Sequence, residues 1–268
     1  MRFLCKLALA VLAGFVALPA TAHEFWLEPE DFTPERGVDV VINHNYGQNF
    51  KGDGLPYVAD WHERYFVAEI RSERPILGFD GDLPAVTMRF LKPGLKILAY
   101  DGTPENQSFE TFAKFEAFLA KAGLAHIAER HRALGKPETD ITERFARQAK
   151  LLLGVGADTE AVRGRDRAVG LRLELVADRN PYRLKPGERL PVRLLFDGEP
   201  IADVTIHAFN RQDPENPVKT TTDAEGRADI ALPVSGPYLL SAIHMFESPP
   251  SDTADWSSLW ASLTFAIP

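Results

Sequence analysis

In this sequence a histidine directly follows an export signal, a position that can become the amino terminus of a mature chain. The first residues are basic, an apolar run covers Leu7–Leu18, and Ala20-Thr21-Ala22 supplies small residues at the −3 and −1 positions. These features are typical of a secretory signal peptide spanning residues 1–22. Cleavage after Ala22 leaves His23 with a free α-amine, and this amine and Nδ1 can chelate one metal ion. The sequence therefore predicts the N-terminal half of a histidine brace.

The chemistry of such a chelate favours a transition metal. The α-amine has a pKa of about 7.7–8.0, so it releases its proton readily when a metal competes. Imidazole nitrogen suits nickel, copper and zinc. Because any residue can follow a cleavage site, chance placement of His23 remains the alternative.

Further ligands would have to come from other segments. His44 and His244 each fall on the apolar face of an expected strand, so each is either a ligand or an ordinary core histidine. His62 lies between acidic residues and is another candidate, and Asp255, in a loop rich in proline and serine, could add an oxygen ligand.

The remaining histidines are weaker candidates. His207 alternates onto one face of an expected strand, whereas His126 and His131 lie among charged residues and are expected on a solvated helix face. The sequence contains neither a G-x-S-x-G nucleophile elbow nor a P-loop.

Composition excludes several classes of site and partner. Without residues 1–22 the chain has 246 residues (268 − 22) and a formal charge of −10 (28 − 38), because the signal carries two of the 30 basic residues. Its single cysteine, Cys5, is removed with the signal, which excludes disulfides and thiolate metal sites. The acidic balance argues against a nucleic-acid partner. No later apolar run approaches 18 residues, so the mature protein is not expected to be membrane-embedded, and a bacterial periplasm is its expected location.

Residue patterns divide the chain into three parts after the signal. Residues 23–104 are predicted as a β domain, because Val38–Tyr46 alternates with period two and glycine-containing turns separate further short runs. Residues 105–168 are predicted as a helical insertion and linker, with one helix containing Phe109–Leu119 and a second over Asp140–Leu153. Residues 169–268 again alternate with period two. The expected fold is mainly β: two sandwich domains, immunoglobulin- or transthyretin-like, with a helical hairpin inserted between them.

Short motifs along the chain are similar in order and spacing to those of the DUF4198 family. The mature start, His23-Glu24-Phe25-Trp26-Leu27, resembles the HEFWL opening of that family, and Thr222–Ala228 looks like a transthyretin-like T-D-x-x-G-x-A hairpin. Other similar segments are Glu143-Arg144-Phe145, Gly170-Leu171, Ala242-Ile243-His244-Met245, Ala254-Asp255-Trp256 and Trp260–Phe265.

The resemblance implies an exported protein that handles a transition metal and is tied to nickel or cobalt uptake. It favours His23 and His244 as ligands, whereas His44 matches no histidine of the family. Trp26, Trp256 and Trp260 are expected to pack the core or to wall the site. Copper is the alternative ion, since nitrogen ligands bind Cu²⁺ more tightly than Ni²⁺ or Co²⁺.

Three functions follow as hypotheses. The leading one is a non-enzymatic protein that captures Ni²⁺ or Co²⁺ with His23 and passes it to a membrane transporter. The second is a copper histidine-brace oxidase acting on polysaccharide, and the third is a structural envelope or adhesion module in which His23 is incidental.

Overall fold

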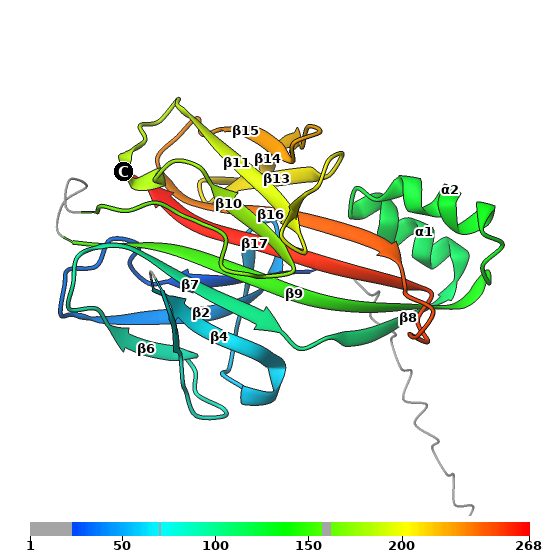
Figure 1. The fold of residues 1–268 in the computed structure, drawn as a ribbon, viewed down its shortest axis with the longest axis horizontal. Coiled ribbons are helices and arrows are strands. Elements are labelled where there is room, and N and C mark those ends of the chain that lie inside the picture. The colour runs from blue at the N-terminus through cyan, green and yellow to red at the C-terminus, as the bar shows by residue number, and fades with distance from the viewer. Residues whose placement is uncertain (1–22, 70, 157–161) are drawn as a thin grey trace, which may run out of the picture.

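The described residues fold into three β-sheets and one pair of α-helices (Figure 1). The computed structural model describes residues 23–69, 71–156 and 162–268, so the expected signal peptide and part of the expected linker lie outside it. The strands are β1 (Glu24–Pro29), β2 (Asp39–Gln48), β3 (Lys51–Leu55), β4 (His62–Ala68), β5 (Glu73–Pro75), β6 (Val86–Arg89), β7 (Gly94–Gly102), β8 (Glu105–Thr111), β9 (Thr139–Val155), β10 (Leu173–Ala177), β11 (Arg189–Phe196), β12 (Glu199–Pro200), β13 (Thr205–Asn210), β14 (Asp213–Thr221), β15 (Arg227–Ala231), β16 (Gly236–Glu247) and β17 (Trp256–Ile267).

A nine-stranded sheet joins the two halves of the chain. Its order is β14-β13-β16-β17-β9-β7-β4-β5, with β8 also paired to β9. Strands β9 and β17 run parallel, whereas β7 and β9 are antiparallel. Because β4 and β7 precede the helices in sequence and β13, β16 and β17 follow them, one continuous sheet supports both β regions.

The two smaller sheets pack against different parts of this large sheet. One contains β1, β2, β3 and β6, and the other contains β10, β11, β12 and β15. The main core includes Leu27 and Ile42 of the first, Leu175 and Leu194 of the second, and Leu263 of the large sheet. The expected mainly-β architecture with sandwich-like packing is therefore confirmed.

The helices are α1 (Phe112–Lys121) and α2 (Ala125–Ala133), and they lie at one end of the long strands (Figure 1). Helix α1 begins where the Thr111 hydroxyl accepts the backbone N–H of Lys114. Its phenylalanines form a second core with the tryptophans of β17; the members of this core include Phe109, Phe112, Phe115, Phe118, Trp256 and Trp260. In the described part of the chain, no helix is long and apolar enough to cross a membrane.

The second helix expected over Asp140–Leu153 is wrong, because these residues belong to β9. Residues 148–155 are buried without interruption, since β9 lies inside the large sheet and is covered on both faces. A strand buried on both faces shows no period-two pattern, so its apolar residues also fit a helical spacing. The second helix is α2, earlier in the chain.

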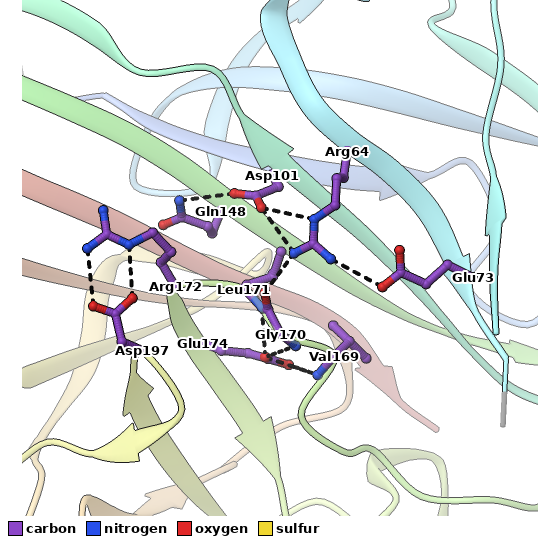
Figure 2. A network of polar contacts seen from close by, with 10 residues as sticks. All are labelled: Arg64, Glu73, Asp101, Gln148, Val169, Gly170, Leu171, Arg172, Glu174 and Asp197. Carbon is purple, nitrogen blue, oxygen red and sulfur yellow. Dashed lines mark hydrogen bonds and ion pairs between the residues drawn. The ribbon is translucent and has the colours of Figure 1, made fainter. Parts of the chain in front are cut away.

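Polar contacts attach the start of the C-terminal β region to the large sheet (Figure 2). Arg64 of β4 donates to Asp101 of β7 at 3.1 Å and to the backbone oxygen of Gly170 at 2.6 Å. Glu174 of β10 accepts the backbone N–H of Val169 at 2.8 Å and the ammonium of Lys150 at 2.9 Å. The segment before β10 is therefore fixed to β4, β7 and β9.

Candidate metal centre

His44 and His62 meet in a cluster of aromatic rings. His44 lies in β2, on the face that packs against the large sheet, and His62 is the first residue of β4. Their imidazole centroids lie 5.2 Å and 5.7 Å from the ring of Tyr65, and 5.5 Å and 5.3 Å from the ring of Tyr100. Tyr57 also contacts His62 at 5.4 Å. Two of the predicted ligands are thus brought together by strands of different sheets.

Three polar atoms in this cluster are buried without a hydrogen-bond partner in the described structure. They are Nε2 of His44, Nδ1 of His62 and the hydroxyl oxygen of Tyr65. Buried polar atoms are almost always satisfied, and unsatisfied ones commonly mark a position for a water molecule or an ion. The cluster therefore presents two imidazole nitrogens and one phenol oxygen to whatever binds there.

Burial keeps these groups in their uncharged forms. Desolvation, together with charge repulsion from the nearby His62, lowers the pKa of His44 to about 4. Desolvation also lowers the pKa of His62 and raises that of Tyr65. Both imidazoles are therefore neutral at pH 7, the form in which imidazole binds a metal.

A cavity of about 330 Å³ adjoins the cluster. Phe25 and Tyr100 line it and also contact His44, so they form the boundary between cavity and cluster. Trp61 and Arg147 line another part of its wall, and the Arg147 guanidinium lies 5.2 Å from the centroid of the Tyr46 ring. None of His44, His62 and Tyr65 lines the cavity, so Phe25 and Tyr100 separate it from the cluster.

His23 lies on the same face of the first sheet as His44 but outside the aromatic cluster. The imidazole of His23 lies 4.6 Å from the ring of Tyr46. Phe25 pairs with Tyr46, and Leu27 with His44, so the Phe25–Tyr46 pair stands between the two histidines. Extending the register by one residue places His23 opposite Gln48, about 13 Å along β2 from His44.

His244 lies in another part of the large sheet. It packs against Phe196 at 4.8 Å and Phe246 at 5.4 Å, and desolvation lowers its pKa. Strands β17, β9 and β7 separate β16 from β4, so His244 and His62 are about 19 Å apart. These two histidines are not brought to one site.

Asp255 lies at the start of β17 with its carboxylate already engaged. Its Oδ2 accepts the backbone N–H of Thr142 at 2.9 Å and the Thr142 hydroxyl at 3.0 Å. This carboxylate joins the ends of two parallel strands, β9 and β17, rather than pointing toward a histidine.

The expectation that His131 lies on a solvated face is wrong, whereas His126 is exposed as expected. His131 is fully buried, accepts the indole N–H of Trp256 at Nδ1 over 2.9 Å, and lies 2.8 Å from the Pro137 carbonyl through Nε2. Trp26, Trp256 and Trp260 pack in the core as expected.

A second cavity, of about 290 Å³, lies on the other face of β1. It is lined by Glu24 and His207, among others, and Oε2 of Glu24 is buried without a partner in the described structure. Burial raises the pKa of Glu24 to about 7. Neither Glu24 nor the tyrosines of the first cluster were candidates from the sequence.

No set of three or more His, Cys, Asp or Glu side chains is arranged to hold a metal ion within the three described ranges. A metal ion bound by His44 and His62 in the aromatic cluster would therefore need further ligands, either Tyr65 or molecules from solution, to complete its coordination shell.

Comparison with known proteins places the chain in a family without assigning an activity. No curated protein matches it. Among solved structures it is similar to the D0-D1 domain of intimin, with 11% identity and a TM-score of 0.22 over 91% of this chain and 99% of that chain. It is also similar to the ligand-binding domain of human OSCAR, with 13% identity and a TM-score of 0.22 over 91% of this chain and 98% of that chain. At these values neither likeness bears on function. The family model described as "Domain of unknown function (DUF4198)" matches residues 20–246, and the chain belongs to this family.

Proposed function

We propose that this protein binds a divalent transition metal outside the cytoplasm, nickel or cobalt in the leading case and copper as the alternative, and serves metal uptake. The supporting observation is the aromatic cluster in which His44, His62 and Tyr65 each hold a buried polar atom without a partner. Two neutral imidazoles and a phenol form a borderline donor set, which suits these ions better than calcium or magnesium.

The electrostatics of the cluster favour binding of a metal ion over protonation of the imidazoles. A proton on His44 would be an uncompensated buried charge, which explains why the pKa of His44 falls to about 4. A divalent ion could instead be neutralised in part by loss of the Tyr65 proton, because metal coordination favours the deprotonated form of a ligand.

The N-terminal chelate of His23 is proposed as a second metal site that serves the same function. His23 lies beside Tyr46, which lines the cavity next to the cluster, so a metal held by the His23 amine and imidazole would lie near the mouth of that cavity. Either this N-terminal site loads the buried site with metal, or it is the only metal site of the protein.

Calorimetric titration with Ni²⁺, Co²⁺, Cu²⁺ and Zn²⁺ separates these cases. The chain beginning at His23 would be compared with a His44→Gln/His62→Gln variant and with a chain carrying one extra N-terminal alanine. His126→Gln, on an exposed helix position, is the matched control. Loss of tight one-to-one binding in the double variant, with binding retained by the extended chain, supports the buried cluster.

Each of the other outcomes favours a different hypothesis. Loss of binding only in the extended chain would place the metal at His23 and refute the buried cluster. Failure of every variant and of the wild type to bind would refute metal binding and leave the structural-module hypothesis. Reductant-driven peroxide production by the copper-loaded protein would favour the oxidase hypothesis.

A further inference from the structure

A groove rich in basic side chains lies at the end of the large sheet opposite the helices. The groove has a volume of about 1090 Å³ and is formed where β4 ends, β7 begins and residues 163–167 return to the sheet. In the described structure eight of its lining residues are Lys or Arg, and Glu69 is its acidic residue. Because Gly94 of β7 pairs with Val155 at the far end of β9 from the helices, the groove and the helices occupy opposite ends of the sheet (Figure 1).

In the described part of the chain, several of these cations form no ion pair with a carboxylate. Arg89 pairs with Asp39 at 2.8 Å, and Arg74 lies 3.8 Å from Glu69. By contrast Arg71, Lys92, Arg163 and Arg165 form no ion pair within the described ranges. This surface therefore carries a local excess of positive charge in a chain whose net charge is −8.

The basic side chains of the groove lie close enough together to shift the pKa of one of them. Desolvation lowers the pKa of Lys96, and repulsion by Lys92 lowers it further. Both lysines flank the turn that enters β7. An anion in the groove would relieve this repulsion.

An exposed leucine lies among these cations. Leu91 is 74% exposed and lines the groove next to Lys92 in sequence. A hydrophilic polyanion would gain nothing from an exposed leucine, whereas the interface of a lipid bilayer accepts apolar side chains and attracts cations at the same depth.

We propose that this groove is a docking surface for a membrane containing anionic phospholipid, with the unpaired cations on the headgroups and Leu91 inserted at the interface. The protein would then be a peripheral membrane-binding protein, held reversibly. Val67 and Ala68, at the end of β4, line the groove, whereas the metal cluster uses His62 and Tyr65 of the same strand. Because none of His44, His62 and Tyr65 lines the groove, docking is proposed independently of metal binding.

Sedimentation with lipid vesicles tests this docking. The chain beginning at His23 avoids the apolar run of the signal, which would partition into lipid by itself. It would be mixed with vesicles of phosphatidylcholine alone, or of phosphatidylcholine with phosphatidylglycerol, at low and high salt. The expected result is binding only to the anionic vesicles, released by salt. Absence of binding to the anionic vesicles would overturn the proposal.

Matched variants locate the surface. Lys92→Glu/Arg165→Glu should weaken binding by at least about tenfold, since each lost cation near an anionic surface removes a substantial part of the attraction. Lys114→Glu/Lys121→Glu makes the same change of charge on α1, at the opposite end, and should leave binding within about twofold. Equal loss in both pairs would show a general charge effect and refute the groove.

The role of Leu91 separates a membrane from other polyanions. Leu91→Ser should weaken vesicle binding several-fold, whereas Leu77→Ser, at a leucine that is 80% exposed and outside the groove, should not. Binding to dextran sulfate without binding to vesicles, or insensitivity to Leu91→Ser, would identify a polyanion site and overturn membrane docking. Unchanged melting temperatures would show that each variant is folded.

Discussion

His44 and His62 pack against the same ring, that of Tyr65, from two strands that belong to different sheets. The sheet that contains β2 and the sheet that contains β4 must therefore be correctly packed before the two imidazoles can share a ligand. The proposed metal site is thus a property of the packed sandwich.

The first prediction concerns the pH dependence of metal binding. In a Tyr65→Phe variant, where no phenol proton has to be released, affinity for Ni²⁺ at the cluster should fall by less than about tenfold between pH 7.5 and 6.0, because desolvation lowers the pKa of His62 as well as that of His44, the latter to about 4. A chelate through the α-amine should lose more than about tenfold over this range, since that amine has a pKa of about 7.7–8.0. Titrations across this range distinguish the two sites.

The second prediction concerns a buried cation. Lys150 is 1% exposed and lies 3.0 Å from Asp166 and 2.9 Å from Glu174. Lys150→Met should destabilise the protein by about 3–5 kcal/mol, because two buried carboxylates lose their partner. Urea unfolding measures the change. Arg172→Ala, which breaks an exposed pair with Asp197, should cost less than about 1 kcal/mol, and similar costs for both variants would contradict this account.

The third prediction concerns a buried acid beside β17. Desolvation raises the pKa of Glu143 to about 7, although Gln107 and Ser258 donate hydrogen bonds to it. Between pH 4.5 and 7 the unfolded chain ionises this group while the folded chain does not, so Glu143 progressively lowers the stability of the wild type.

Glu143→Gln should therefore become more favourable relative to the wild type as the pH rises, by about 2–3 kcal/mol between pH 5 and pH 8. Unfolding curves at the two pH values measure this difference. A difference that does not vary with pH would show that Glu143 is ionised in the folded protein.

The fourth prediction contrasts two histidines of α2. His131→Leu leaves the buried indole N–H of Trp256 without its acceptor and should cost about 1–3 kcal/mol. His126→Leu changes an exposed position and should alter stability by less than about 0.5 kcal/mol. Equal effects in thermal unfolding would mean that the Trp256–His131 hydrogen bond contributes nothing.

Period-two alternation was sufficient to predict much of the fold. It identified β2, β11 and β13, because each has one face in the core and the other partly exposed. It also identified β10, where polar and apolar residue types alternate at its start although all five residues are buried. It failed for β9, because a strand covered on both faces has no such alternation. The mainly-β fold with a helical pair could thus be predicted, but not the long strand that joins its halves.

The candidate site could be predicted only in part. Alternation placed His44 on the buried face of its strand, but nothing in the sequence pairs it with His62, because that contact depends on how two sheets pack. Tyr65 and Glu24 were missed because a tyrosine or a glutamate next to a strand is ordinary until its polar atom proves to be buried without a partner. His131 was misplaced because its neighbours are charged, although it follows Ile127 by one helical turn on the buried face.

Locating the bound ion in crystals of the Ni²⁺-loaded protein tests the central claim most directly. Anomalous scattering measured at the nickel absorption edge reports the position of the metal independently of its affinity. The account predicts a peak between His44 Nε2 and His62 Nδ1, beside the Tyr65 oxygen. A peak only at the His23 amine, or no ordered nickel in fully loaded protein, would contradict it.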